Sequence, residues 1–303
     1  MNVNLSPPGQ GAPLLTVKRL LLPLIAHPRV AHTLKYVVYL GLIFNLGRFV
    51  WDDYLAMQAA LPEDASLSDY LTQFSTSIDM VAWVGLVFLF ELETYAVPDY
   101  KWTTSLAGII RTLRVVCYLM IGYAAYGYTV ESLENYETTE VAGLTNVCEL
   151  ADQGTSLQTS IFEYVEITSG NCESLSNDDR FYRISNEVSV IDESTLDHVQ
   201  WLGWLDIDNA YIWLIVVFLI EAEVWLQSRD RFSSPTLNKV RVTKSFFYLV
   251  LIGNMVIWLV NGYYLYAWDA FLWIFGFWAI EMNLAEWEMD RVDELRAQPI
   301  ANM

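Results

Sequence analysis

The sequence contains few of the side chains that hold metals and haem. It has 3 histidines and 3 cysteines among 303 residues. The histidines, His27, His32 and His198, all fall outside the long apolar runs. Haem and histidine-ligated metal centres need such side chains at defined spacing, and metal clusters need more cysteines than these. We therefore expect no metal site and no cofactor.

Basic residues are also scarce. Lys and Arg total 17 against 36 Asp and Glu, which gives a formal net charge of -19. Nucleic acid as a partner would require a basic patch that neutralises phosphates, and the chain has none. The sequence likewise lacks a Gly-rich phosphate loop, a nucleophile elbow and an HExxH motif. Without a positioned base or nucleophile, we expect no enzymatic activity.

Apolar residues, in contrast, are abundant. They make up 54% of the chain, whose mean hydropathy is +0.29. Six mostly apolar runs are each about twenty residues long, which is enough to cross a bilayer. The runs occupy residues 33–51, 77–97, 112–130, 209–227, 243–265 and 269–287. The sequence therefore predicts an all-α polytopic membrane protein, with transmembrane helices 1–3 in residues 31–130 and helices 4–6 in residues 209–290.

The basic residues lie mainly on one side of these predicted spans. Fourteen of the 17 fall in the N-terminal tail, in the linkers after the second and fourth spans, at the first residues of the odd spans, or after the sixth span. Because Lys and Arg near helix ends resist translocation, both termini are expected in the cytoplasm, with the chain in the inner (plasma) membrane. Residues 291–303 form the C-terminal tail. In the N-terminal tail, residues 1–30, the stretch 13–27 fits either a short helix lying on the inner leaflet or an irregular segment.

Residues 131–208, between the third and fourth spans, are expected outside the cytoplasm as an acidic cap. Their first half indicates helix, whereas "SIFEYVEI" and "RFYRISNEVSVI" alternate apolar and polar residues as hairpin strands do. The prediction is a small α+β domain. Cys148 and Cys172 both lie in it, and an oxidising exterior favours a disulfide between them. The negative charge of the cap would concentrate cations at the outer face.

Short motifs recur at matched positions in the spans. The odd spans begin with "KYVVYL" (35–40), "RVVCYL" (114–119) and "KSFFYL" (244–249). Each even span contains a tryptophan, namely Trp83, Trp213 and Trp273. Eight residues after each tryptophan stands a glutamate: Glu91, Glu221 and Glu281. Four residues before each stands a carboxyl or amide residue: Asp79, Asn209 and Asp269. This register predicts one helical hairpin repeated three times, with the cap inserted in the second copy.

Each repeat pairs an anchor with a charge. The three tryptophans are assigned to the headgroup region as interfacial anchors. The glutamates then lie about 12 Å deeper, at 1.5 Å per residue, in the inner leaflet. An ionised carboxylate there costs about 2.5 kcal/mol or more unless it is paired, hydrated or protonated. The nearest candidate partners are the basic residues that begin the odd spans, Lys35, Arg114 and Lys244.

Two interpretations of the glutamates follow. They form inner-leaflet ion pairs that fix the packing of the hairpins, or they converge around the repeat axis as an ion-binding or relay site. The second predicts a channel or transporter for cations or protons. The alternative is a non-transporting structural or accessory subunit, which docks into a larger membrane assembly through its helices or cap. Expected partners are therefore lipid, and other membrane subunits or further copies of the chain.

Polar residues inside the odd spans are few. Asn45 and Asn254 occupy the same repeat position, ten residues after Lys35 and Lys244. Asparagine within a span usually forms a hydrogen bond to a neighbouring helix. We expect both side chains to join helices of the bundle.

Overall fold

The computed structural model describes residues 28–92, 103–227 and 235–277. The chain divides into two compact units, one made of residues 1–42 and 275–303 and the other of residues 43–274. The first is described at residues 28–42 and 275–277, where Val38 and Leu42 are buried. The second unit contains the candidate site.

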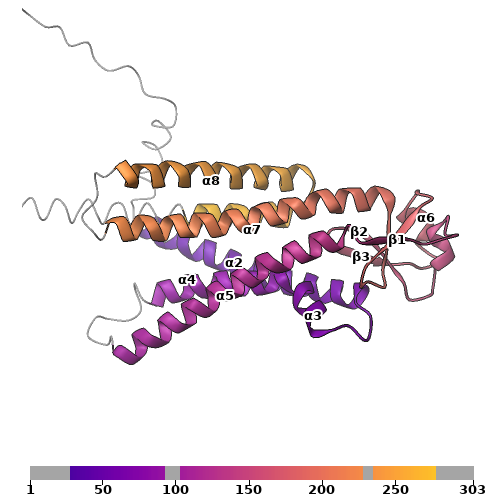
Figure 1. The fold of residues 1–303 in the computed structure, drawn as a ribbon, viewed down its shortest axis with the longest axis horizontal. Helices are drawn as coiled ribbons and strands as arrows, with labels where there is room; N and C mark the ends of the chain where they lie inside the picture. Colours follow the sequence, from indigo (N-terminus) through magenta and orange to yellow (C-terminus); the bar gives the residue numbers. More distant parts are fainter. Residues whose placement is uncertain (1–27, 93–102, 228–234, 278–303) are drawn as a thin grey trace, which may run out of the picture. The chain divides into compact units, whose positions relative to one another are not determined.

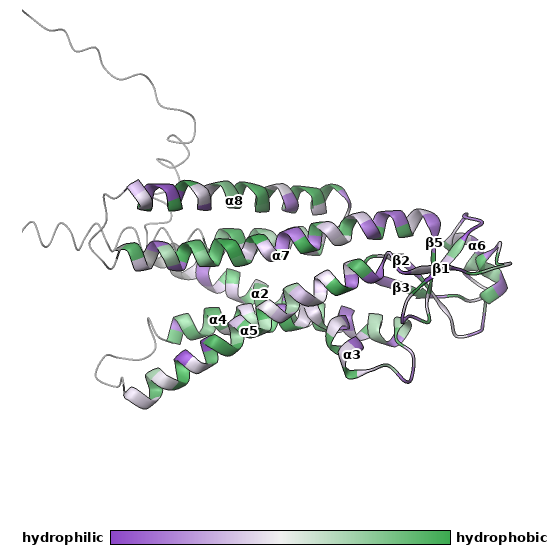
Figure 2. Ribbon diagram, viewed as in Figure 1, coloured by the Kyte–Doolittle hydropathy of each residue, from purple (hydrophilic) through white to green (hydrophobic). Residues whose placement is uncertain are grey.

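Long helices make up most of the described chain (Figure 1). They are α2 (Pro28–Ala60), α3 (Leu67–Gln73), α4 (Ser75–Glu91), α5 (Thr104–Glu134), α7 (Glu193–Gln227) and α8 (Pro235–Val260), and residues 264–277 are also helical. Within the described residues, α5, α8 and the segments Thr33–Ala60 and Glu193–Glu223 are long and apolar enough to cross a membrane. The pair α3 and α4, bent by 62°, is a fifth candidate. Figure 2 shows apolar residues along these helices and hydrophilic ones in the cap.

The predicted spans one to five fall on α2, α4, α5, α7 and α8. The second span, residues 77–97, and the sixth, residues 269–287, continue past residues 92 and 277 and so lie partly outside the described residues. The stretch 13–27 and the C-terminal tail, residues 291–303, lie wholly outside them, as does most of the N-terminal tail. Several helices are longer than the apolar runs, and α7 begins at Glu193 rather than at residue 209. An apolar run marks only the part of a helix that avoids water, whereas the backbone hydrogen bonds continue into polar turns.

Two close approaches between helices involve glycine and serine. A Cβ atom on Gly127 of α5 would lie 1.9 Å from Oγ of Ser75 at the start of α4. A Cβ atom on Gly203 of α7 would lie 2.7 Å from Oγ of Ser132, which donates a hydrogen bond to the Gly203 carbonyl at 3.0 Å. Such small residues let helix backbones pack closely, as membrane helices commonly do.

A carboxylate from α2 holds the first turn of α4. Asp53, which is 7% exposed, accepts hydrogen bonds from the backbone N–H of Ser77 at 2.9 Å and from its Oγ at 2.6 Å. The first N–H groups of a helix have no partner within the helix. Asp53 therefore stabilises the end of α4 from which the cavity described below is lined.

The segment between α5 and α7 folds into a mixed five-stranded sheet. The strands are β1 (Thr138–Glu140), β2 (Ser156–Ser160), β3 (Glu163–Glu166), β4 (Phe181–Ile184) and β5 (Val190–Asp192), in the order β1-β4-β5-β2-β3. Only the β2–β5 pair is parallel among these described strands. The predicted α+β cap is confirmed.

Two details of the cap prediction were wrong. Its first half holds β1 and the short helix η3 (Val147–Leu150) rather than a long helix. The stretch "SIFEYVEI" is not one strand, because β2 ends and β3 begins within it. The turn between them places Ile161, 5% exposed, in the core, so alternation along the sequence does not follow one face of one strand.

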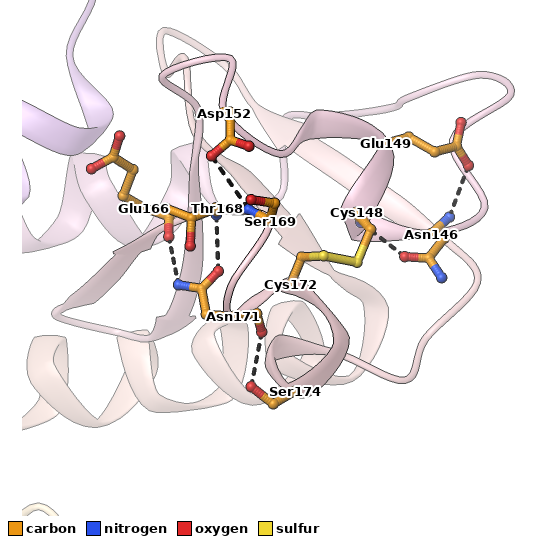
Figure 3. Close-up of a disulfide and its surroundings, with 10 residues drawn as sticks. All are labelled: Asn146, Cys148, Glu149, Asp152, Glu166, Thr168, Ser169, Asn171, Cys172 and Ser174. Atoms are coloured by element: carbon orange, nitrogen blue, oxygen red, sulfur yellow. Dashed lines mark hydrogen bonds between the residues drawn. A yellow bond between two sulfur atoms is a disulfide. The ribbon is translucent and has the colours of Figure 1, made fainter.

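A disulfide between Cys148 of η3 and Cys172 of α6 (Cys172–Leu175) confirms the predicted pair (Figure 3). Asparagines fix the backbone beside both cysteines. The side chain of Asn146 accepts a hydrogen bond from the N–H of Cys148 at 2.8 Å, and that of Asn171 accepts one from the N–H of Thr168 at 2.9 Å. The bridge lies against the core of the cap, formed by Leu144, Val147, Leu157, Ile167, Phe181 and Val190.

A second apolar cluster joins the cap to the helices. Ile161, Ile184 and Ile191 from the sheet pack with residues of α7, with Trp258 of α8 and with Ala267. The chain passes directly from β5, which ends at Asp192, into α7, which begins at Glu193. The cap, the N-terminal part of α7 and the C-terminal end of α8 therefore share one core.

Candidate functional site

A cavity of about 70 Å³ lies within the unit formed by residues 43–274. Helices α2, α4, α5, α7 and α8, the helical residues 264–277 and Phe162 of the cap all contribute to its lining. A volume of this size holds a few water molecules or one small ion, since a single water needs roughly 10–15 Å³ measured with a water-sized probe.

The three tryptophans of the even spans meet at this cavity. The ring centroids of Trp83 and Trp213 are 6.0 Å apart, and those of Trp83 and Trp273 are 5.8 Å apart. Their exposed fractions are 6%, 8% and 7% in the order of the sequence. The rings therefore contact other helices, and their assignment to the headgroup region as interfacial anchors stays a prediction. The face of each helix that carries the indole points into the bundle, where aromatic pairs add about 0.5–1.5 kcal/mol each beyond burial.

Three carboxyl residues line the same cavity: Asp79 from α4, Asp206 from α7, and Asp269. Oδ1 of Asp79 accepts a hydrogen bond from Nε1 of Trp83 at 3.1 Å. Asp269 accepts one from Nδ2 of Asn45 at 2.7 Å and another from the side chain of Trp273. Each of these carboxyl groups is half-buried.

Helix geometry explains the pairing of aspartate with tryptophan. Residues four apart lie one above the other on a helix, so the indole N–H can reach the carboxylate one turn earlier. In α7 the corresponding position holds Asn209, which also lines the cavity, and the carboxyl group comes from Asp206 one turn before it. All three even helices thus present an acidic or amide side chain beside their tryptophan.

The electrostatics of the cavity are one-sided. None of the described lining residues is Lys, Arg or His. The carboxyl groups of Asp79 and Asp269 are close enough to interact electrostatically with each other. Ionised carboxylates without a counter-charge are costly away from bulk water, so such groups hold protons or attract a cation. The arrangement can therefore bind a small cation or exchange protons.

The predicted glutamate site is at a different place. Glu91 is the last residue of α4, and Glu221 on α7 is exposed and accepts a hydrogen bond from the hydroxyl of Tyr118 at 3.1 Å. Neither lines the cavity. Glu281 lies outside the described residues. The role of these glutamates as ion-binding or relay residues stays a prediction.

The ion pair at the start of α8 involves a different glutamate from the one predicted. Nζ of Lys244 binds Oε2 of Glu223 at 2.6 Å, and Nε of Arg241 binds Oε1 of the same residue at 2.6 Å. Residues two apart on a helix point about 200° apart. Glu223 therefore faces α8, while Glu221 faces Tyr118 of α5.

The other two predicted partners have contacts of their own. Nζ of Lys35 lies 5.7 Å from the ring centroid of Tyr39, a cation–π arrangement within α2. Arg114 and Glu221 both lie within electrostatic range of the Tyr118 side chain. Helices α5 and α7 are therefore linked through Tyr118.

Several cavity residues are absent from the sequence-predicted site. Asp206, Tyr128 and Tyr266 line the cavity but do not occupy a repeated position beside a tryptophan. The signal for Asp206 was its place in the mainly apolar stretch "WLGWLDIDNAYIWL", because an ionisable residue inside a span marks a functional position by default. The predicted hydrogen bonds of Asn45 and Asn254 are confirmed: Asn45 binds Asp269, and Asn254 Nδ2 binds Oδ2 of Asp208 at 2.9 Å.

The comparisons with known proteins supply no function for the site. Across the residues that the structure describes, no three His, Cys, Asp or Glu side chains come together closely enough to hold a metal ion. Comparison of the chain with protein-family models, with curated protein sequences and with solved structures finds no match. What the chain does must therefore be inferred from the cavity itself.

Proposed function

We propose that this chain is a membrane channel or transporter that binds a small cation or proton in the cavity beside Asp79, Asp206 and Asp269. The observation that carries the proposal is the charge of the lining: three carboxyl residues and, among the described residues, no basic one. Ionisable groups inside membrane helices are costly and mark pathways for ions and protons.

The proposal includes six spans arranged as three repeated hairpins, with cytoplasmic termini and an extracytoplasmic cap. It is supported by the register of the repeat, since positions 79, 209 and 269, and positions 83, 213 and 273, all line one cavity. A repeat that keeps its orientation is expected to place equivalent residues around an axis along the membrane normal. The acidic cap would raise the local concentration of cations at the outer mouth.

The glutamates at the other end of the even helices fit the same proposal. Glu91, Glu221 and Glu281 lie twelve residues beyond Asp79, Asn209 and Asp269, which is about 18 Å along a helix. In this view they relay the charge between the cavity and the cytoplasm. Their contribution is separable from that of the aspartates, because each set can be changed without the other.

Flux in liposomes tests the proposal. The purified chain is reconstituted in vesicles. A pH-sensitive dye inside reports proton flux under an imposed gradient, and uptake of radiolabelled monovalent cations reports cation flux. We expect flux from the wild-type chain and its loss in Asp79→Asn, Asp206→Asn and Asp269→Asn. Asp197→Asn is the matched control, because Asp197 is an exposed residue of the same helix as Asp206.

The accessory-subunit alternative predicts the opposite result in the same experiment. Flux would be absent from the chain alone, and purification in mild detergent would co-isolate a stoichiometric partner. Flux that persists unchanged in all three aspartate variants would overturn the assignment of the cavity.

A further inference from the structure

The lining of the cavity also bears on which cation it takes. Aromatic side chains from several elements surround the carboxyl groups: the three tryptophans described above, and also Trp258, Tyr266 and Tyr128. Tyr266 is itself held by rings, with Phe162 stacked on it at 4.3 Å and Trp258 at 5.4 Å between centroids. Aromatic rings attract cations through their electron-rich faces, most strongly when water is excluded.

The oxygen atoms of the cavity are dispersed rather than gathered. Asp79, Asp206 and Asp269 come from different helices, and no three such side chains in the described part of the chain are placed to ligate one metal ion. Calcium and magnesium need six or more oxygen atoms at 2.0–2.6 Å. The lining is therefore unsuited to a divalent ion that must shed its water.

An ammonium group has requirements that this lining meets. Each of its N–H bonds donates to one oxygen, so the acceptors can be apart, and the remaining surface of the cation can rest on aromatic faces. The carboxylates supply charge-assisted acceptors, which are the stronger kind. The volume of about 70 Å³ suits a small ion rather than a long amine.

We infer that the cavity binds ammonium or a small methylated ammonium ion, held by the aspartates and the tryptophans. This inference rests on the proposed function, because it names the cation for the same cavity. Sodium, like the divalent ions, is held by several oxygen atoms gathered around one point, so the dispersed oxygens disfavour it. The volume disfavours large amines. The cation is thus recognised by directional hydrogen bonds and ring faces together.

Binding of radiolabelled methylammonium to the purified full chain in detergent tests the inference. We expect saturable binding that ammonium displaces, while equal concentrations of sodium, calcium or choline displace it at least tenfold less effectively. This competition uses the wild-type chain and does not depend on any variant folding correctly. Displacement by sodium or calcium as effective as that by ammonium overturns the inference.

Variants locate the binding. Asp206→Asn and Asp269→Asn are expected to weaken methylammonium binding at least tenfold, the effect of losing about 1.4 kcal/mol. Trp213→Leu is expected to weaken it about threefold to thirtyfold, as removal of a cation–π contact does. The controls Asp197→Asn and Trp201→Leu change exposed residues of α7 and should leave binding unchanged. Unaltered binding in the folded aspartate variants overturns the inference.

The two proposals fail in different ways. Proton or sodium flux that depends on the aspartates, with no methylammonium binding, refutes the ammonium site and leaves the proposed function standing. Absence of both flux and cation binding refutes both. Methylammonium binding and uptake that depend on the aspartates support both.

Discussion

The indole of Trp83 donates a hydrogen bond from Nε1 to Oδ1 of Asp79, 3.1 Å away and one turn earlier in α4. The bond joins the two kinds of side chain that define the cavity, because Trp83 also packs against Trp213 and Trp273. A buried donor bound to a carboxylate restricts which way that carboxylate can turn. The indole of Trp83 therefore positions Asp79, and the packing of Trp213 and Trp273 from two other helices positions that indole.

Replacing Trp83 with Phe removes this donor and keeps most of the ring. We expect Trp83→Phe to lower the free energy of unfolding by about 1–2 kcal/mol, from the lost hydrogen bond and the reduced packing. Thermal unfolding in detergent, followed by circular dichroism, measures the loss. Trp201→Phe is the control because Trp201 is 50% exposed. An equal loss in both variants would show that the hydrogen bond and packing of Trp83 do not stabilise the fold more than an exposed tryptophan does.

Gly127 tests how closely α4 and α5 pack. A methyl group there would lie 1.9 Å from Oγ of Ser75, so Gly127→Ala should destabilise the chain by about 1–3 kcal/mol through overpacking. Gly122→Ala on the same helix has nothing within 4 Å and should be tolerated. Adding Ser75→Gly to Gly127→Ala should restore part of the lost stability. Equal melting temperatures for the two alanine variants would show that the helices are further apart.

The two glutamates near the C-terminal end of α7, Glu221 and Glu223, should behave differently. Glu223→Gln removes the carboxylate that binds Lys244, whose side chain is 9% exposed, and we expect a loss of about 1.5–3 kcal/mol. Glu221→Gln changes an exposed side chain and should alter stability by less than about 0.5 kcal/mol. Thermal shift measures both. A larger loss in Glu221→Gln than in Glu223→Gln would instead support the predicted pairing of Glu221 with the basic residues.

The stability of the cap should depend on pH through Glu187. Burial, with the nearby charge of Glu134, raises the pKa of Glu187 from 4.5 to about 7, although Ser189 and Tyr164 donate hydrogen bonds that oppose the shift. The folded chain thus keeps this proton to a higher pH than the unfolded chain does. Stability should therefore fall as pH rises from about 4.5 to about 7, by on the order of 3 kcal/mol.

Glu187→Gln isolates this effect, because the amide cannot lose a proton in this range. The variant should match the wild-type chain near pH 4.5 and be more stable near pH 8, as measured by denaturant unfolding at each pH. Glu166→Gln, which changes an exposed residue of β3, should keep the wild-type profile. A Glu187→Gln variant with the wild-type slope between pH 4.5 and 7 would assign the pH dependence to other groups.

Loss of the disulfide should weaken the cap. The bridge closes a loop between residues 24 apart, which corresponds to about 3–4 kcal/mol of restricted freedom in the unfolded chain. Cys148→Ser combined with Cys172→Ser, and reduction of the wild-type chain by dithiothreitol, should lower the melting temperature equally. Cys117→Ser leaves the bridge intact and serves as the control. An unchanged melting temperature in the double variant would mean that the core alone holds the cap.

The apolar runs predicted the helices of the first five spans, because such runs have few other uses in a chain of this charge. The cap was also predicted as a small α+β domain, and the pairing of Cys148 with Cys172 followed from their shared location. The strand boundaries were not predicted correctly, because Ile161 lies in a turn and is nevertheless buried in the core. A local pattern of alternation cannot distinguish a turn residue that tertiary packing buries.

The site illustrates where the sequence was less informative. The spacing of Asp79, Trp83 and their equivalents was visible in the sequence. The depth of these residues in the membrane, however, was assigned only from the enrichment of tryptophan at the headgroups. Whether an indole faces lipid or other helices depends on how the helices rotate about their axes, and a single sequence does not fix that rotation. Asp206 was missed because the repeat position in α7 holds Asn209, and the carboxyl group comes from one turn earlier.

The direct junction between β5 and α7 has a mechanical consequence. Asp192 accepts a hydrogen bond from the N–H of Thr195 at 2.8 Å, and Arg180 forms an ion pair with Glu193, so the first turn of α7 is tied to the sheet. No linker separates the helix from a central strand of that sheet. A rotation of α7 about its axis would therefore be transmitted to the cap. A spectroscopic label on the exposed edge of the cap would register such a rotation.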